Sequence, residues 1–274
     1  MTYKSALKIL LVAAATLGWL TGLARADTIE DIKKKGTLVV GVKADYPPYG
    51  MRDPSGEIVG MEVDMAKDVA QRLGVKLQLE PVVASNRMQF LQQGKTDLMI
   101  ATMSVNDERK KAVGIVEPYY YAGGVALLAA KSAKIKTGAD LKGKPVCAIQ
   151  GAFYNNEISS KMTGQDLIAF KGVPENEQAL QNGQCVGFAY DDVLLIYTKK
   201  ANADKWKDFE VVQLDIAPLP WGIAVKSEDK DTPWGKFMSD IVTDWHKKGT
   251  LVALEKKWLG ENTQWLIDAN AKAK

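Results

Sequence analysis

Thr37-Leu-Val-Val-Gly-Val42 is a short, β-branched apolar run that follows Gly36, and this pattern predicts a buried strand. Apolar residues then recur at helical spacing over residues 61–73 and stop at Gly74, a residue that typically ends a helix. Residues 75–83 form a second apolar run and predict a second strand. The order strand, helix, strand indicates an α/β sheet with helices on its faces.

The same alternation continues and predicts two α/β lobes joined by more than one crossing strand. Ligands in open α/β sheets bind at the carboxyl ends of strands, so the loops that follow the strands are where a site is expected. The expected strands and apolar runs are 97–102, 125–130, 145–149, 166–170, 186–190 and 221–225. The expected helices are 88–93, 155–162, 175–182, 234–248 and one that ends at 258, and the loops of interest are 43–49, 102–109, 150–155 and 190–192.

The composition of the 274-residue chain excludes several classes of protein. Hydrophobic residues make up 46 % and charged residues 25 %, which is ordinary globular usage and excludes a disordered or low-complexity chain. One His and two Cys are too few for a zinc cluster of the usual Cys/His kind. The length predicts one large domain or two of roughly 100–150 residues each.

Residues 1–26 have the three parts of a secretory signal peptide. Lys4 and Lys8 precede an apolar run over residues 9–20, and Ala24-Arg25-Ala26 provides a small-x-small cleavage site. Such a run rises about 18 Å as a helix, too little for a bilayer core of about 30 Å, which argues against a transmembrane anchor. The bases of this leader account for the formal charge of +3, so we expect the mature chain to be neutral overall.

Cys147 and Cys185 are expected to form a disulfide bond, because export delivers the chain to an oxidising compartment. Closing a loop of this length contributes roughly 3–4 kcal/mol in the chain-entropy model. A redox-active pair is the alternative, but the spacing is not C-x-x-C and the sequence places no His nearby to activate a thiol.

The decapeptide ATMSVNDERK carries groups that suit the binding of a carboxylate. Thr102 and Ser104 supply hydroxyls where a strand ends. Asn106 or Asp107 can cap a new helix that has Arg109 in its first turn. A helix start offers free N–H groups and a positive dipole end, and a guanidinium binds a carboxylate through two hydrogen bonds. The alternative is a capped helix whose arginine is a solvated surface charge.

Two further pairs of residues follow expected strands. Tyr46 and Tyr49 lie on a loop stiffened by two prolines, where they either wall a pocket or pack on the lobe surface. Asp191 and Asp192 follow an apolar strand, where a carboxylate can neutralise an ammonium group. Two adjacent Asp are too few oxygen ligands for a metal loop, and the chain has no G-x-S-x-G motif. His246 is expected on the surface of an amphipathic helix.

Several short motifs occur in an order typical of one family of binding proteins. They are Tyr46-x-Pro48-Tyr49, Gly60-x-x-Val63-Asp64, Asp97 on a strand, Asp107-Glu-Arg-Lys110, Tyr119-Tyr120 and Lys257-Trp258-Leu259-Gly260. With these motifs the chain resembles the periplasmic amino-acid-binding proteins of bacterial ABC importers, also called solute-binding protein family 3. The resemblance covers essentially all of residues 30–262, and the Asp-Glu-Arg-Lys block is its most specific part.

The resemblance implies an α/β, two-lobe periplasmic-binding-protein fold of type II, in which a hinge closes the lobes on a ligand in the cleft between them. Residues 27–121 and 220–274 would form the first lobe and residues 122–219 the second. It further implies a periplasmic monomer that captures an amino acid and delivers it to the permease of an ABC transporter in the inner membrane. We expect no enzymatic activity, no metal or other cofactor and no nucleic-acid partner.

The resemblance also implies roles for residues around the cleft. Arg109 would hold the ligand α-carboxylate. Ser104 and the backbone at Thr102 would add contacts to the carboxylate and the amine. Asp191 would receive the α-ammonium group, and Tyr46 would cover the bound ligand.

The remaining positions bear on the second lobe and on the ligand class. Backbone donors at Gln150, Phe153 and Tyr154 would come from the second lobe, where the two bulky rings narrow the cleft. Lys43 stands where binders of cationic ligands carry Asp, and Arg87 matches an arginine that contacts the side-chain carboxylate in glutamate/aspartate binders. Two cations at one pocket favour a second anion, so glutamate or aspartate is the expected ligand. Cations pointing to solvent would instead leave room for glutamine or asparagine, and a dehydratase-like enzyme on this scaffold is a further alternative.

Overall fold

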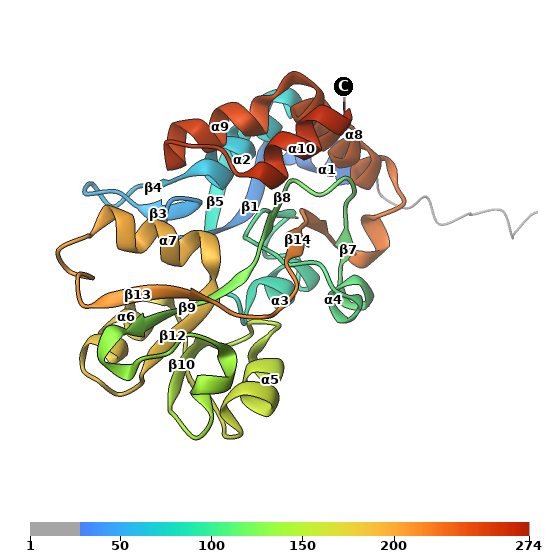
Figure 1. Cartoon of the computed structure of the whole chain (residues 1–274). Helices are drawn as coiled ribbons and strands as arrows, with labels where there is room; N and C mark the ends of the chain where they lie inside the picture. The colour runs from blue at the N-terminus through green and yellow to red at the C-terminus, as the bar shows by residue number, and fades with distance from the viewer. Residues whose placement is uncertain (1–27, 274) are drawn as a thin grey trace, which may run out of the picture.

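The molecule has two halves, each built around its own five-stranded sheet (Figure 1). The computed structural model describes residues 28–273. The expected signal peptide, residues 1–26, therefore lies outside the described part. Residues 28–273 form mixed α/β layers, as the strand–helix alternation predicts.

The first sheet combines residues from early and late in the chain. Its longest pairing joins β1 (Thr37–Lys43) in parallel to β5 (Lys76–Val82) along the whole length of both strands, and β1 also pairs in parallel with β6 (Leu98–Met99). β15 (Ala224–Val225) lies antiparallel between β6 and β7 (Gly114–Ile115), which gives the order β5-β1-β6-β15-β7. The other elements of this half are the strands β2 (Asp45–Tyr46), β3 (Gly50–Arg52) and β4 (Ile58–Val59) and the helices α1 (Thr28–Lys35), α2 (Met61–Leu73), α3 (Arg87–Gln92), α4 (Asp107–Ala112), η4 (Ser227–Asp229), α8 (Pro233–Lys248), α9 (Thr250–Leu259) and α10 (Gln264–Ala273).

The second sheet comes from one continuous part of the chain. β10 (Val146–Ile149) pairs in parallel with β11 (Ile168–Phe170) and β12 (Gly187–Asp191). β9 (Val125–Ala130) lies antiparallel between β12 and β13 (Phe209–Gln213), which gives the order β11-β10-β12-β9-β13. The helices of this half are η1 (Lys131–Ala133), η2 (Gly138–Leu141), α5 (Asn155–Glu157), η3 (Ile158–Thr163), α6 (Val173–Gln181) and α7 (Asp192–Ala201).

The expected disulfide bond is present in the second half. Cys147 lies on β10 and Cys185 lies just before β12, with Cα atoms 5.7 Å apart, the usual separation for a disulfide. Both residues are buried. Because β10 and β12 are neighbours in the sheet, the bond ties β10 to the segment that leads into its neighbouring strand.

Two antiparallel strands run between the halves near the centre of the molecule, as Figure 1 shows. They are β8 (Tyr121–Gly123) and β14 (Leu219–Trp221). The single strand expected over residues 221–225 is wrong, because β14 ends at Trp221 and β15 begins only at Ala224. The reason is a change of partner: Trp221 pairs with β8, whereas Ala224 pairs with strands of the first sheet.

Aromatic side chains pack around the crossing strands. The ring centroid of Trp221 lies between 5.0 and 6.5 Å from those of Tyr46, Tyr49, Tyr120 and Tyr121. All five side chains are fully buried, and two of the four Trp221 pairs, those with Tyr46 and Tyr49, have the edge-to-face geometry that aromatic rings prefer. The cluster fixes the loop after β1 against the crossing strands. The expected boundaries between the lobes fall within the crossing strands β8 and β14. The division of the chain into these two lobes stays a prediction.

The expectation that His246 is a surface residue is wrong. The side chain is buried, its Nε2 lies 2.8 Å from the carbonyl O of Tyr119, and its ring centroid lies 6.5 Å from that of Trp265. Trp265 belongs to α10, which the sequence pattern did not predict and which packs against α8. Within residues 28–273, none of the helices combines the length and the apolar character that a membrane span requires.

Candidate functional site

Residues that follow strands of the two sheets meet where the lobes touch. Tyr46 Oη donates a hydrogen bond to Asp191 Oδ2 at 2.8 Å, and Arg109 Nη2 donates to the carbonyl O of Gly151 at 3.1 Å. Each bond joins the first lobe to the second, so the lobes are closed on each other here. The candidate site consists of Lys43, Tyr46, Glu62, Arg87, Thr102, Ser104, Arg109, Tyr154 and Asp191.

Arg109 lies in the first turn of α4, as expected. The Asn106 side chain accepts a hydrogen bond from Arg109 N at 2.9 Å, so Asn106 is the cap and Asp107 is the first helical residue. The guanidinium group donates to the carbonyl O of Ser104 at 2.8 Å, and the residue is only 5 % exposed, which excludes a solvated surface charge. Burial lowers the pKa of Arg109 to about 9, and the charge of Arg87 acts in the same direction, so Arg109 stays cationic at neutral pH.

Asp191 ends β12 and presents a buried anion to the site. Burial raises its pKa to about 6, the hydrogen bond from Tyr46 opposes this shift, and the charge of Asp192 adds to it. Asp191 is therefore ionised at neutral pH and can pair with a cation. The Asp192 side chain instead binds backbone groups: its Oδ1 accepts hydrogen bonds from the N–H groups of Gly124 at 2.9 Å and Val193 at 2.7 Å.

Lys43 and Arg87 do not point to solvent, since they are 1 % and 3 % exposed. Lys43 Nζ forms an ion pair with Asp45 Oδ1 at 2.7 Å. Burial lowers the pKa of Lys43, and the Asp45 charge opposes that shift. Arg87 Nη1 donates to the carbonyl oxygens of Ala101 and Thr102. Arg87 Nε has no hydrogen-bond partner among the residues that the structure describes.

Glu62 is a member of the site that sequence reasoning missed. It lies in the first turn of α2 and is fully buried, and its Oε1 accepts from Thr102 N at 2.7 Å and from Tyr120 Oη. Burial raises the pKa of Glu62 to about 7, although these hydrogen bonds and the charge of Arg87 oppose the shift. The available sequence signal is an acidic residue at the start of a helix, and such a residue is ordinarily solvated.

The backbone at Gly60 and Thr102 brings Glu62 into position. Gly60 has a φ of 144°, and a Cβ there would lie 2.3 Å from the carbonyl O of Tyr49, so the start of α2 can approach this loop only with glycine. Thr102 has a φ of 46°, which is unusual for a β-branched residue. Such strain costs on the order of 1–3 kcal/mol and is typical of functional sites. The bond from Thr102 N to Glu62 helps to stabilise it.

The loop after β10 contributes only part of what was expected. The structure does not bring Gln150 into the site, because its side chain is exposed and its N–H donates to the carbonyl O of Phe170 at 2.8 Å. Tyr154 is buried, and its hydroxyl has no partner within residues 28–273. The Phe153 ring centroid lies 5.9 Å from Arg109 Cζ. These two rings therefore line the site from the second lobe and narrow it.

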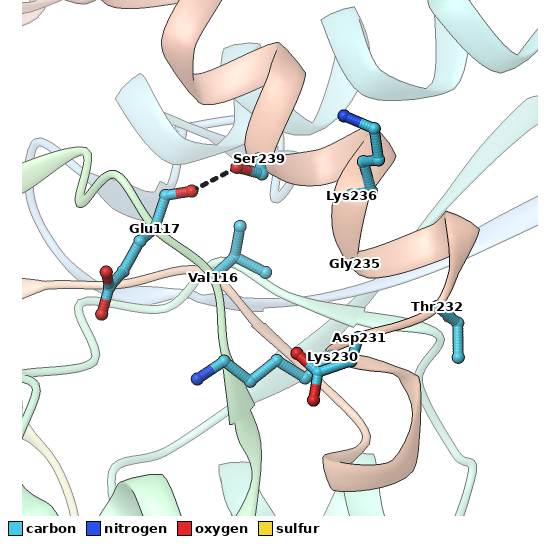
Figure 2. Close-up of a pocket in the computed structure, with 8 residues that line it drawn as sticks. All are labelled: Val116, Glu117, Lys230, Asp231, Thr232, Gly235, Lys236 and Ser239. Atoms are coloured by element: carbon cyan, nitrogen blue, oxygen red, sulfur yellow. Dashed lines mark hydrogen bonds between the residues drawn. The ribbon is translucent and has the colours of Figure 1, made fainter.

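Two of the hollows in the molecule's surface that lie outside this group of side chains have charged linings. One, of about 220 Å³, lies between the lobes, with Asp45 on one side and Lys171 and Glu175 on the other. The other, of about 380 Å³, lies beside the start of α8, where Ser239 Oγ donates to the carbonyl O of Glu117 (Figure 2). Its charged side chains have both signs, and none of the candidate residues lines it. Its lining residues are Val116, Glu117, Lys230, Asp231, Thr232, Gly235, Lys236 and Ser239.

The donor groups of the described residues bear on metal binding and on the kind of ligand. Within residues 28–273, no group of three or more His, Cys, Asp or Glu side chains is placed to hold a metal ion. In the candidate site, Arg87 and Arg109 of the first lobe lie near enough to the Asp191 carboxylate of the second lobe to oppose the rise that burial causes in its pKa, and groups of both signs side by side suit a zwitterion.

Two α/β lobes, two crossing strands and charged side chains at the contact between the lobes are the architecture of a hinged binding protein for a small polar solute. The family model of the bacterial extracellular solute-binding proteins, family 3, matches residues 38–261, and the chain belongs to this family. Its fold is the two-lobe, type II periplasmic-binding-protein fold.

Similar proteins bind amino acids. The chain is 31 % identical over 243 residues to the ABC transporter glutamine-binding protein of Bacillus subtilis (strain 168), which covers 87 % of this chain and 86 % of the relative. It is 27 % identical over 272 residues to the glutamate/aspartate import solute-binding protein of Salmonella typhimurium (strain LT2), over 92 % of this chain and 88 % of the relative.

A solved structure agrees with these relatives. The crystal structure of an ancestral amino acid-binding protein, a precursor of cyclohexadienyl dehydratase, is similar with a TM-score of 0.74 and 29 % identity. The similarity covers 85 % of this chain and 99 % of that one. The protein is therefore an amino-acid solute-binding protein of an ABC importer.

Proposed function

We propose that this protein captures glutamate or aspartate in the periplasm and delivers it, as a monomer, to the permease of an ABC transporter. The observation that carries the proposal is the burial of Lys43, Arg87 and Arg109 where the lobes meet. Burying a cation costs free energy unless a partner compensates, and the Arg87 Nε–H group has no partner in the described part of the chain. A side-chain carboxylate on the ligand can supply this partner.

Arg109 and Asp191 are proposed to hold the groups common to all amino acids. The Arg109 guanidinium would bind the α-carboxylate, and the Asp191 carboxylate would bind the α-ammonium group. That ammonium would share Asp191 with the Tyr46 hydroxyl, so that Tyr46 lies over the ligand. Ser104 and the Thr102 backbone, which flank the two arginines, would add contacts to the carboxylate and the amine.

The charges around Arg87 favour an acidic side chain over a neutral one. Lys43 is already neutralised by its ion pair with Asp45. The charge of Arg87 acts on Glu62 in the same lobe, and the Glu62 pKa of about 7 leaves that carboxyl group partly protonated at neutral pH. With Glu62 neutral, Arg87 is a surplus positive charge in a buried site, and one ligand carboxylate balances it.

Glutamine is the second candidate ligand. If Glu62 is ionised, Asp45 and Glu62 together balance Lys43 and Arg87, and a neutral polar side chain fits the site. The relative from Bacillus subtilis carries glutamine in its name, which supports this candidate.

Binding without chemical conversion is the proposed activity. A fold does not determine a function by itself, and the solved ancestor that preceded a dehydratase has the same fold. Proton NMR of a ligand incubated with the protein tests this directly. We expect an unchanged ligand spectrum, and the appearance of a product would support the enzymatic alternative.

Calorimetric titration with a panel of amino acids tests the ligand class. We expect glutamate or aspartate to bind more tightly than glutamine. Arg87→Ala should weaken acidic ligands by on the order of 2–5 kcal/mol, because a desolvated charge pair is lost, and should change neutral ligands much less. Arg52→Ala is the matched control, because this exposed arginine bonds only to the nearby carbonyl of Gly56 in the described chain. Equal losses for both ligand classes would contradict a specificity role for Arg87.

A further inference from the structure

Glu62 is a buried carboxyl group whose two oxygens have different surroundings. Oε1 accepts hydrogen bonds from Thr102 N, at 2.7 Å, and from Tyr120 Oη, whereas Oε2 has no partner among the described residues. A buried, ionised carboxylate with an unpartnered oxygen carries a desolvation cost. A proton on Oε2 would remove that cost and leave both bonds to Oε1 intact.

The charged and titratable groups that face Glu62 come from several segments of the first lobe. Lys43 on β1 and Arg87 on α3 favour the ionised form, as does the hydrogen bond from Tyr120 just before β8. Tyr49, on the loop before β3, is a further hydroxyl influenced by the Glu62 charge. Burial outweighs these effects and sets the pKa of Glu62 at about 7. Glu62 can therefore gain or lose a proton near neutral pH.

We propose that Glu62 takes up a proton when an acidic ligand binds, so that the ligand's side-chain carboxylate replaces the Glu62 carboxylate as the anion that balances Arg87. The proton comes from solvent and binds to Oε2, and no other covalent bond forms or breaks. Two ionised carboxylates near one arginine in a buried site repel each other, whereas one ionised and one neutral group leave the charge balanced. This inference rests on the proposed acidic ligand.

The consequence is that affinity for an acidic ligand depends on pH. Below the pKa of Glu62 the free protein already carries the proton, and above it binding must draw a proton from solvent. The affinity for glutamate therefore falls as pH rises above 7, approaching about tenfold per pH unit. Asp191 has a pKa of about 6, so it is largely ionised across the range from pH 7 to 8.5 and adds little to the slope.

Calorimetry in two buffers of different ionisation enthalpy counts the protons taken up on binding. For the mature protein titrated with glutamate at pH 7.5, we expect uptake of roughly three quarters of a proton, the ionised fraction of a group with a pKa of about 7. Glu62→Gln should take up none, and its glutamate affinity should not vary between pH 7 and 8.5.

A second variant tests the inference even if Glu62→Gln fails to fold. Tyr120→Phe removes a hydrogen bond that favours the ionised form of Glu62, so the pKa should rise and the uptake at pH 7.5 should decrease. Tyr119→Phe is the matched control, because the Tyr119 hydroxyl bonds to Glu117 at the surface, and it should show the uptake of the unmodified protein.

The outcomes separate this inference from the proposed ligand. Binding of glutamine with no binding of glutamate or aspartate overturns the proposed ligand and this inference with it. Binding of glutamate without proton uptake, or with equal uptake in Glu62→Gln, overturns the inference alone.

Discussion

Arg109 is buried between two carbonyl oxygens that belong to opposite lobes, those of Ser104 and Gly151. Carbonyls offer only partial charges, so an anionic ligand group can compensate this guanidinium more fully. We predict that Arg109→Ala weakens binding of every amino-acid ligand by on the order of 2–5 kcal/mol, about 30- to 4,000-fold in Kd. Gln150→Ala, at an exposed side chain, should leave the Kd within about twofold, in line with the small effect of most surface substitutions. Calorimetric titration measures both, and a nearly unchanged Kd for Arg109→Ala would remove Arg109 from its proposed role.

Glu62 and Asp191 make the stability of the ligand-free protein depend on pH. Burial raises their pKa values to about 7 and about 6, from 4.5 and 3.8. The folded state thus binds more protons than the unfolded state between about pH 4 and 7. The free energy of unfolding therefore falls as pH rises through this window, by up to about 1.4 kcal/mol per pH unit for each proton. Thermal unfolding should show a Tm that decreases from pH 5.5 to 7.5, and less steeply in Glu62→Gln. Identical slopes would contradict the prediction.

Local periodicity predicts an element well when the pattern itself reports which face is buried. The helix expected over residues 61–73 is confirmed as α2, and the run 37–42 is confirmed as β1. The break within 221–225 could not be predicted, because it depends on which strand each residue pairs with across the molecule. Likewise α10 was not predicted from the sequence, and its packing on α8 shows why it forms.

Part of the candidate site could likewise be predicted from the sequence. The rule that ligands bind at strand carboxyl ends predicts that Tyr46, Arg109 and Asp191 lie near one another, and the structure places them so, while their roles in binding stay predictions. Glu62 could not be found in this way, because a first-turn acid has the same local pattern whether it is solvated or buried. Its burial depends on Tyr120, beside the crossing strands, which is distant in sequence. The position of Gln150 could not be predicted for a similar reason, because its N–H group bonds to Phe170 beside the second sheet.

α10 closes over the crossing strands and stabilises them. Leu266 is fully buried, and the Trp265 ring centroid lies 6.1 Å from that of Tyr121 on β8. We predict that Leu266→Ala lowers the free energy of unfolding by about 2–5 kcal/mol, the usual cost of a buried Leu→Ala change. Ile267→Ala is the matched control on the same helix, since Ile267 is 44 % exposed, and should change stability by about 0.5 kcal/mol or less. Denaturant titration checks both, and similar effects of the two substitutions would show that α10 does not pack as described.

Polar contacts hold the lobes together across the candidate site and its margins. They include the bond from Tyr46 to Asp191, the bond from Arg109 to Gly151 and the exposed ion pair of Lys200 with Glu261 at 3.1 Å. A ligand can favour the closed form only through contacts that are stronger there than in the open form. Groups that bind the ligand from both lobes, as Arg109 and Asp191 are proposed to do, meet this condition. The bond between Tyr46 and Asp191, in contrast, joins the two lobes of the protein without a ligand.

Removing that bond should open the ligand-free molecule. A hydrogen bond contributes about 0.5–1.5 kcal/mol net, so Tyr46→Phe should raise the ratio of open to closed protein roughly two- to twelvefold. Small-angle X-ray scattering should then give a larger radius of gyration for ligand-free Tyr46→Phe than for the unmodified protein. A saturating ligand should remove most of this difference, because Asp191 then gains the α-ammonium group as its partner. Tyr154→Phe is the control, because the buried Tyr154 hydroxyl has no partner in the described chain. An equal radius for ligand-free Tyr46→Phe and Tyr154→Phe would show that this bond does not hold the lobes closed.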